Sequence, residues 1–504
     1  MPENGRRILG SKSAFLRYEI DDSVKQVRGR CEWISQSNRD FENYLDIIVR
    51  HSYYQCNLTY LAKVWKPTQP LTPPMNSNTP APTSPHRFPW IYVPTLYFAQ
   101  GLPYVLVNSV SVIMFKKMGV PNTLIGLTSL LYLPWVVKPL WGPTVDIFWT
   151  KRRWLASAQI VMAVQFALVA AVLHLPEFFT VSLMVFILLA FTSATHDIAV
   201  DGFYMLALNE DRQAFFVGIR STCYRLAMIF GNGALVVLAG YWETRLANIP
   251  VSWAVVMLTS SAIFVLLFLF HSFYLPHPLA DTRSSPDFNR RLKSAAASPM
   301  TAFLAAFKSY FKQPRIAPIL AFIVLYRLGE AMLVKMAAPF LLDAKDAGGL
   351  ALSTQTVGFV YGTVGVLSLV IGGIAGGWLI SKFGLRKSIW PMAIALNAPD
   401  LVYVYLAYSE PSLPLVYVLV ALEQFGYGVG FAAFLVFLMY TAKEPFKTSH
   451  YAISTGFMAL GMMLPGLASG YLQSALGYQH FFILVCLLTL PGMAAIFFIP
   501  LNEE

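Results

Sequence analysis

The sequence predicts an all-α membrane protein, with twelve transmembrane helices in two six-helix halves. The first observation behind this is composition: 12% of the 504 residues are charged and 56% are hydrophobic, whereas soluble domains carry roughly 25% charged residues. The second is the recurrence of apolar runs of about 20 residues, the length that crosses the ~30 Å hydrocarbon core of a bilayer. These runs fall into two sets of six, separated by a polar stretch.

The apolar runs define the expected spans and the domain boundaries. In the first half they lie at 90–114, 122–141, 155–174, 181–207, 214–240 and 251–274. In the second half they lie at 316–341, 354–380, 388–408, 414–441, 450–472 and 479–500. The chain therefore divides into a polar extension (1–87), an N-terminal six-helix half (88–275), a cytoplasmic linker (276–315) and a C-terminal six-helix half (316–504).

The N-terminal extension is expected to be disordered. Its last part, "KPTQPLTPPMNSNTPAPTSPHRF", is dense in Pro, Ser, Thr and Asn, and such a composition buries too little apolar surface to offset the entropy of ordering. It lacks the basic start, apolar core and small-residue cleavage site of a signal peptide. It is either a cytoplasmic tail or the product of a start codon placed too far upstream, with translation beginning near Met75.

The distribution of basic residues predicts the orientation. Sixteen Lys and Arg residues lie in the loops after even-numbered spans and in the central linker, against four in the opposite loops. Because cytoplasmic loops are enriched in Lys and Arg, both termini are expected in the cytoplasm. The net charge of +11 is explained by this topology. The basic residues are dispersed and form no single stripe, so no nucleic-acid partner is expected.

The four cysteines, Cys31, Cys56, Cys223 and Cys486, have no metal-ligand spacing. We therefore expect neither a metal site nor a disulfide framework, and no cofactor. The "GYGVG" stretch at 426–430 has neither a preceding strand nor a following Gly-Lys-Ser/Thr, so it is read as close helix packing and not as a nucleotide loop.

A loop motif occurs twice, at corresponding places in the two halves. "GPTVDIFWTKRR" follows the second span and "GWLISKFGLRKS" the eighth. Both resemble the loop signature of the major facilitator superfamily: a glycine for close helix approach, an acid four residues on, another glycine and a basic pair. Trp149 and Ser381 depart from the pattern. The candidate motif residues are Gly142, Asp146, Arg152, Gly377, Gly384 and Arg386.

A finer resemblance covers roughly residues 88–500. "ATHDIAVDGFYMLAL", "CYRLAMIFGNG", "IVLYRLGEAMLVKMAAPFLL", "EQFGYGVGFAAFLVFLMY" and "HYAISTGFMALG" are similar to segments of AmpG-type muropeptide permeases, a group that also includes acetyl-CoA transporters. The resemblance implies an importer of anhydro-muropeptides in the bacterial inner membrane, driven by protons and serving cell-wall recycling and beta-lactamase induction. The protein is expected to be a monomer. Other anionic solutes, such as an acyl-CoA ester or a siderophore-like compound, remain alternatives, as do sugars.

Charged residues inside the fourth and fifth spans mark a candidate site. A carboxylate at the bilayer centre costs at least ~2.5 kcal/mol and normally faces a protein interior or a water-filled path. Asp197 and Arg225 each lie eleven residues from the loop that joins these spans, near the midplane at ~1.5 Å per residue. Asp201 and Arg220 also lie at matching depths, counted from the same loop. Two stacked acid–base pairs are therefore expected. These pairs either act as a proton or substrate switch or only hold the hairpin together, and His196 is read as a packing residue.

The second half places Arg327 eleven residues into the seventh span, with Glu330 one turn further on. Arginine suits the carboxylates of a muropeptide, so Arg225 and Arg327, with Arg220, are the substrate-binding candidates. An internal Arg327–Glu330 pair is the alternative. Asp197, Asp201 and Glu330 are the proton-coupling candidates, and the two aspartates are preferred because like charges on one helix face repel each other.

Four further charged residues lie inside the predicted spans. By residue count along their helices, Lys335 and Glu423 both lie in the half of the membrane away from the linker. They are expected to form an outer gate. The alternative is that the Lys335 side chain only extends to water. Lys138 is read as a topological anchor, and Asp400 has no assigned role. Such charges suit a secondary transporter. The spans lack the convergent catalytic set of an enzyme and the ring-like filter of a channel, so transport is the predicted function.

Overall fold

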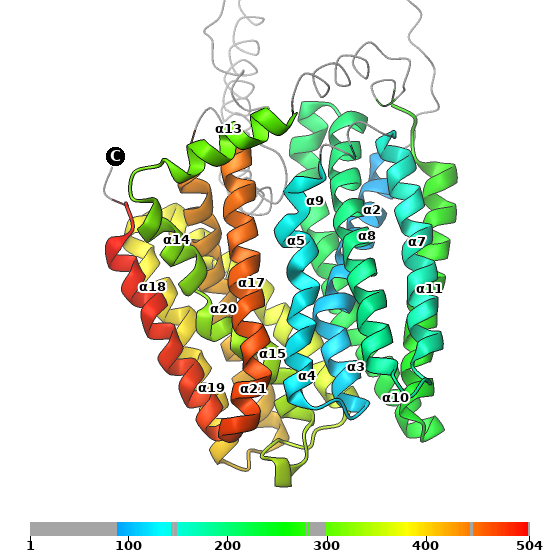
Figure 1. The fold of residues 1–504 in the computed structure, drawn as a ribbon, viewed down its shortest axis with the longest axis vertical. Helices are drawn as coiled ribbons and strands as arrows, with labels where there is room; N and C mark the ends of the chain where they lie inside the picture. Colours follow the sequence, from blue (N-terminus) through cyan, green and yellow to red (C-terminus); the bar gives the residue numbers. More distant parts are fainter. Residues whose placement is uncertain are drawn as a thin grey trace, which may run out of the picture.

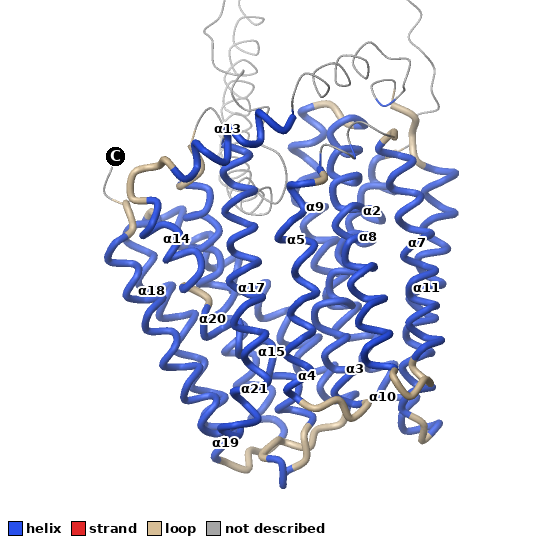
Figure 2. Tube along the Cα trace, in the orientation of Figure 1, coloured by secondary structure: helices blue, strands red, loops and turns tan. Residues whose placement is uncertain are grey.

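The computed structural model describes residues 88–142, 145, 149–278, 281, 299–443 and 447–501. Within these ranges every regular element is a helix, and Figure 2 shows helices joined by short loops. Eleven helices in this part of the chain are long and apolar enough to cross a membrane. The last, Ser449–Phe498, has a non-helical residue at Gly477 (φ 71°), where the chain turns back (Figure 1). The helical segments before and after Gly477 each count as one span, which gives the twelve expected spans.

The N-terminal half uses several elements for some of its spans. Its elements are α2 (Pro89–Val105), η3 (Leu106–Val110), α3 (Ser111–Lys117), α4 (Asn122–Leu127), η4 (Thr128–Tyr132), α5 (Leu133–Val137), η5 (Lys138–Leu140), α7 (Lys151–Val172), α8 (Phe178–Ala207), α9 (Glu210–Ile229), η6 (Phe230–Leu235), α10 (Val236–Leu246) and α11 (Ile249–Tyr274). The first and fifth spans each contain a π-helical segment, η3 and η6.

The C-terminal half contains two interrupted spans. Its elements are α14 (Ile316–Leu325), α15 (Leu328–Leu342), η8 (Lys345–Ala347), α16 (Thr354–Val357), η9 (Gly358–Gly365), α17 (Val366–Phe383), α18 (Leu385–Asn397), η10 (Ala398–Asp400), α19 (Leu401–Tyr408), α20 (Leu413–Tyr440), α21 (Lys447–Ala495) and η11 (Ile496–Phe498). The seventh span breaks at Arg327 (φ −113°, ψ 22°). The ninth changes to a 3₁₀ turn at Pro399, because proline has no N–H for the helix ladder.

The linker between the halves contains a helix that the sequence analysis did not predict. This helix, α13 (Pro299–Phe311), lies across one end of the bundle (Figure 1). It docks through Tyr310, which is fully buried, stacks on Phe457 and shares a 2.9 Å hydrogen bond with Ser454 of α21. Burial raises the pKa of the Tyr310 hydroxyl, so this group stays protonated. The 1–87 extension and residues 282–298 of the linker lie outside the described residues.

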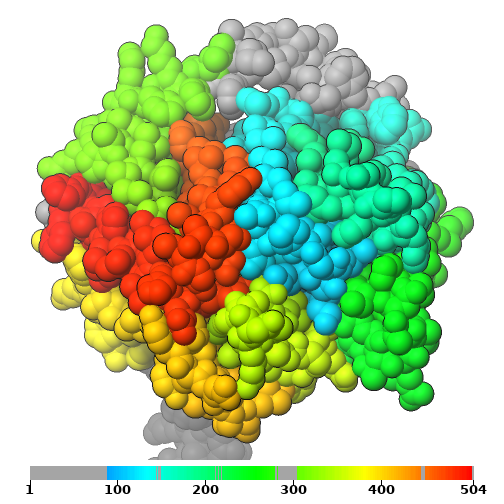
Figure 3. All heavy atoms as spheres, turned by 60° about the horizontal axis from the view of Figure 1, so that its bottom comes forward, coloured from blue at the N-terminus to red at the C-terminus, as the bar shows by residue number. Residues whose placement is uncertain are grey.

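The end that carries α13 and the α8–α9 loop is called the linker face, and the end that carries η8 and the α3–α4 loop is called the far face. At the far face the two halves are in close contact. A Cβ at Gly470 of α21 would lie 1.9 Å from the carbonyl oxygen of Asn122 in α4, so only glycine permits this approach. Lys116 Nζ lies 2.5 Å from Asp343 Oδ1, across the same boundary. Figure 3 shows this face without an opening between the halves.

Candidate functional site

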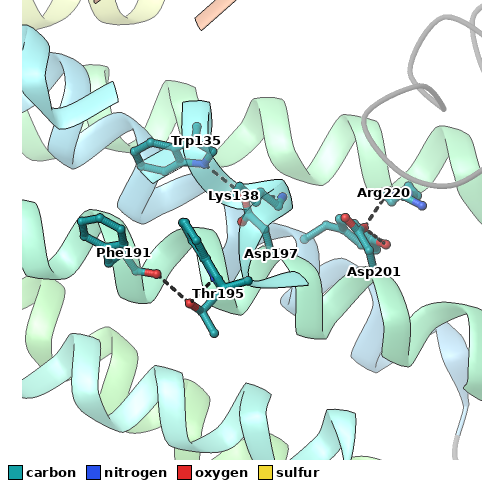
Figure 4. Close-up of polar contacts among 9 residues, drawn as sticks. Trp135, Lys138, Phe191, Thr195, Asp197, Asp201 and Arg220 are labelled. Atoms are coloured by element: carbon teal, nitrogen blue, oxygen red, sulfur yellow. Dashed lines mark hydrogen bonds and ion pairs between the residues drawn. The ribbon is translucent and has the colours of Figure 1, made fainter. Parts of the chain in front are cut away.

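The predicted pair Asp201–Arg220 is present and buried between α8 and α9. Arg220 Nη2 lies 2.9 Å from Asp201 Oδ1 (Figure 4). Tyr97 donates its hydroxyl to the same oxygen at 3.0 Å. The guanidinium carbon also lies 4.4 Å from the ring centroid of Tyr97 and 4.9 Å from that of Tyr204. Two aromatic faces and a carboxylate therefore surround the arginine, which fixes this pair in place.

The predicted pair Asp197–Arg225 is wrong. Asp197 Oδ2 instead accepts from Trp135 Nε1 at 3.2 Å and lies 3.5 Å from Lys138 Nζ (Figure 4). Counting residues gave the right depth, but not the direction around the helix. Arg225 follows Arg220 by five residues, which is roughly 140° around an α-helix at about 100° per residue. It therefore points away from the face that meets Asp201. Lys138, read from the sequence as a topological anchor, is an ion-pair partner.

Arg225 and Arg327 approach the same tyrosine from opposite halves. Arg327, at the break between α14 and α15, donates to the Tyr427 hydroxyl of α20, and its guanidinium carbon lies 4.7 Å from the Phe431 ring centroid. Arg225 of α9 lies close enough to Tyr427 to interact with it electrostatically. Arg225 forms no hydrogen bond or ion pair with another residue of the described ranges. The alternative Arg327–Glu330 pair is not formed.

Aromatic side chains surround this meeting point. Tyr104 of α2 packs edge-on against Trp135 at 5.1 Å, lies 6.4 Å from Tyr224 and interacts electrostatically with Tyr132. Tyr224 and Tyr427 were not among the candidate site residues selected from the sequence. We define the central cluster as Tyr104, Tyr132, Tyr224, Arg225, Arg327 and Tyr427. It joins both halves at mid-depth and presents two guanidinium groups among hydroxyl groups and rings.

A second set of charges lies entirely within the C-terminal half. Glu330 of α15, Asp400 of η10 and Glu423 of α20 each offer a carboxylate oxygen, and these oxygens lie within 4.8 Å of one another. All three residues are at most 1% exposed. We call them the acidic cluster. From the sequence, each of the three could be recognised only as an isolated acidic residue inside an apolar span. It could not show that three different spans bring them together.

The proposed gate residues have different partners. Lys335 is 4% exposed, donates to Thr128 Oγ1 of η4 at 3.0 Å and lies 5.8 Å from the Tyr132 ring centroid. The reading of Lys335 as a lysine extending to water is therefore wrong, and it bridges the two halves instead. Glu423 belongs to the acidic cluster and accepts from Gln424 at 3.0 Å, so the structure forms no Lys335–Glu423 gate.

The far face is closed by residues that the sequence analysis did not select. Asn122 of α4 donates to Gln473 Oε1 at 2.7 Å and to the Tyr478 hydroxyl at 2.9 Å, both in α21. Tyr478 in turn donates to Asp343 at 2.6 Å, and Asp343 pairs with Lys116. This network links the two halves at the far face.

The loop motif of the first half secures the start of α7. Asp281 accepts the backbone N–H groups of Lys151 (2.8 Å) and Arg152 (3.1 Å), and the Arg152 guanidinium donates to the Ser272 carbonyl of α11. A Cβ at Gly142 would meet nothing within 4 Å, so the expected close approach at this glycine is absent. Asp146 lies outside the described residues.

In the second half the motif is less connected. Gly377 is buried in α17, and Gly384 ends that helix with φ 75°, a conformation that favours glycine. A Cβ at Gly384 would meet nothing within 4 Å, so its role is to end the helix and not to permit close packing. Arg386 is exposed.

His196 is a packing residue, as the sequence analysis expected. Its Nε2 lies 3.1 Å from the Gln159 amide, which also contacts His271 Nδ1, and His271 Nε2 lies 2.9 Å from Thr95 Oγ1. All three ring and amide side chains are fully buried. They tie α2, α7, α8 and α11 together on the side of α8 away from Asp197.

Twelve membrane-crossing segments in two halves, with charged side chains held between them at mid-depth, define a secondary transporter. The chain belongs to the Major Facilitator Superfamily, whose family model matches residues 95–334 and 323–504. It is distantly related to AmpG-type permeases. An anhydromuropeptide permease of Escherichia coli (strain K12) is 26% identical over 403 residues, which cover 79% of this chain and 77% of the relative.

A further relative matches most of the chain, and two solved structures share its fold. An uncharacterized protein of Haemophilus influenzae is 24% identical over 425 residues, 81% of this chain and 93% of that protein. The nucleoside transporter NupG superposes with a TM-score of 0.60 at 18% identity, covering 82% of this chain and 98% of its own. A bacterial homologue of the human lysosomal transporter Spinster gives a TM-score of 0.55 at 16% identity, covering 82% and 95%.

Proposed function

We propose that this transporter imports anhydro-muropeptides through the bacterial inner membrane, with both termini in the cytoplasm. The observation that carries the proposal is that Arg327 donates to Tyr427, while Arg225 of the other half interacts electrostatically with the same side chain. The 26% identity to the E. coli anhydromuropeptide permease supports the same substrate class.

The chemistry of the central cluster suits such a substrate. The peptide part of a muropeptide carries carboxylates, and a guanidinium group binds a carboxylate through two parallel hydrogen bonds. Arg225, which has no ion-pair partner within the described residues, is available for this contact. Arg327 is held by one tyrosine hydroxyl, which a carboxylate would replace. The rings of Tyr104, Tyr224 and Trp135 offer apolar faces to the sugars.

The proposed orientation places the linker face in the cytoplasm. The loops and linker expected there contain sixteen Lys and Arg residues against four on the opposite side, in accordance with the positive-inside rule. The far face, sealed by Asn122, Asp343 and Tyr478, is then periplasmic. A transporter in this arrangement would receive its substrate from the periplasm only after the far-face network opens.

Uptake of labelled anhydro-muropeptide into right-side-out membrane vesicles tests the proposal. We expect uptake that depends on this protein and is abolished by an uncoupler. Replacing Arg327→Gln should raise the half-saturating concentration roughly tenfold or more, because a hydrogen bond between charged groups contributes about 1.5–3 kcal/mol. Arg245→Gln is the matched control: Arg245 is exposed in the last turn of α10, near the far face, and its loss should leave uptake unchanged.

Competition with other solutes tests the substrate assignment separately from the assignment as a transporter. An acyl-CoA ester and a siderophore-like compound are added in excess over labelled muropeptide. If either is itself accumulated while muropeptide is not, the substrate assignment is wrong and the transporter class stands.

A further inference from the structure

The acidic cluster lies where two membrane-spanning helices are interrupted. Glu330 is in the first turn of α15, just after the break at Arg327. Asp400 ends the 3₁₀ turn η10 between α18 and α19. Glu423, in the uninterrupted helix α20, faces both. Discontinuous helices near the midplane are where secondary transporters place coupling-ion sites.

Within the described residues no cation forms an ion pair or a hydrogen bond with this cluster. Both carboxylate oxygens of Glu330 and both of Asp400 lack a hydrogen-bond partner, although the residues are 0% and 1% exposed. Glu423 receives only the amide of Gln424. The nearest cation along the chain, Arg327, donates instead to Tyr427.

An unpartnered hydroxyl points to the same place. Tyr403 of α19 is fully buried, and its hydroxyl has no hydrogen-bond partner in the described residues. It interacts electrostatically with Glu423, Glu330 and Asp400. A buried hydroxyl that senses three carboxylates in this way can donate to one of them or supply an oxygen ligand to a cation bound by them.

The groups facing the cluster come from several helices, and most are neutral. Arg327 contributes one positive charge against as many as three negative ones. The other titratable neighbours are Tyr361 of η9, Tyr403 of α19, Tyr427 of α20 and Cys486 of α21.

Three carboxylates this close cannot all stay charged in an apolar interior, because burial and mutual repulsion both oppose it. Something positive must occupy the cluster. We propose that Glu330, Asp400 and Glu423 bind a small monovalent cation, either a sodium ion or a proton shared between carboxylates. We further propose that this ion drives transport, a step that rests on the proposed function. Both cations use the same chemistry, attachment to carboxylate oxygen.

The acidic cluster suits this role better than the two aspartates of the N-terminal half. Asp201 is held by Arg220 and Tyr97, and Asp197 by Lys138 and Trp135. Each aspartate already has a cationic partner, so neither requires an ion. The repulsion between like charges, which favoured the aspartates from the sequence, applies in the structure to Glu330 and its two neighbours.

The test uses purified full-length protein in lipid nanodiscs without muropeptide, so its result is independent of the proposed substrate. The sodium arm measures equilibrium binding of ²²Na⁺. The proton arm records the infrared band of protonated carboxyl groups at neutral pH without sodium. Asp400→Asn and Glu423→Gln remove ligands, and Glu410→Gln is the matched control because Glu410 is exposed and pairs only with Lys345.

We expect wild-type protein and Glu410→Gln to show either saturable sodium binding or a protonated-carboxyl band, and both Asp400→Asn and Glu423→Gln to lose most of that signal. Sodium binding that displaces the band identifies sodium as the ligand, and a band indifferent to sodium identifies the proton. Wild-type protein with neither signal overturns the proposal without reference to any variant. So does a signal that survives in both variants, once their melting temperatures show that they are folded.

Discussion

At the scale of single residues, the charges inside the membrane-crossing helices are of two kinds. In the N-terminal half, Asp197 and Asp201 each meet a cation and an aromatic donor. In the C-terminal half, Glu330 and Asp400 lie close to Glu423 and form no hydrogen bond or ion pair within the described residues. The first kind is suited to hold helices in register, and the second is suited to receive a ligand.

The Asp201–Arg220 pair predicts a characteristic pattern of stability. Asp201→Asn or Arg220→Gln alone leaves one buried charge uncompensated, which costs roughly 3–5 kcal/mol for buried pairs in soluble proteins. The double variant should recover much of this loss. Thermal unfolding of the purified variants measures it.

Lys138→Gln is the comparison for this prediction. Its contact with Asp197 is longer, 3.5 Å, and the lysine side chain is 22% exposed, so a smaller loss is expected. A double variant that is no more stable than the worse single variant would show that Asp201 and Arg220 do not depend on each other.

Individual residues also show which parts of the candidate site could be predicted from the sequence. Counting from a shared loop placed Asp201 opposite Arg220, because depth follows directly from residue number in a helix. The same counting paired Asp197 with Arg225 wrongly, since it ignores rotation about the helix axis. The acidic cluster could not be predicted from the sequence, for a different reason. Its members come from the seventh, ninth and tenth spans, and only tertiary packing decides that these spans adjoin.

At the scale of helices, close approach between the halves depends on glycine. Gly470 faces the Asn122 carbonyl, and Gly362 of η9 faces the Asn232 carbonyl of η6, where a Cβ would lie 1.9 Å and 2.0 Å away. Apolar periodicity located the helices well: the run expected at 181–207 is α8, Phe178–Ala207. The sequence analysis missed the break at Arg327 and the helix α13, which depend on contacts with other elements.

Replacing Gly470→Ala should prevent closure of the far face and reduce uptake strongly, because the added methyl group overlaps a backbone oxygen that cannot move aside. Ser129 of η4 is fully buried against Gly466 of α21, between the two halves. In a Ser129→Cys background, a membrane-impermeant thiol reagent should then modify position 129 faster than with Gly470 intact. Gly373→Ala is the matched control, since a Cβ there meets its nearest atom at 3.9 Å. Equal modification rates in both variants would contradict the role given to Gly470.

At the scale of the whole molecule, two six-helix halves meet at the far face and hold the central cluster between them. Lys335 to Thr128 and Asn122 to Gln473 join the halves by hydrogen bonds, which can break and re-form as the halves move. Arg225 and Arg327 belong to different halves, so a substrate bound to both would couple its own movement to theirs. The fold class and this division were predictable from composition and the spacing of apolar runs, because the bilayer fixes the length of each span.

Counterflow of labelled anhydro-muropeptide in proteoliposomes tests the central claim most directly. Liposomes containing the purified protein are loaded with unlabelled muropeptide and diluted into a trace of labelled muropeptide, with no ion gradient. Alternation of the two halves around one binding site predicts a transient accumulation of label above its equilibrium level, which liposomes lacking the protein do not show. Label that never exceeds equilibrium in loaded, protein-containing liposomes would contradict the account.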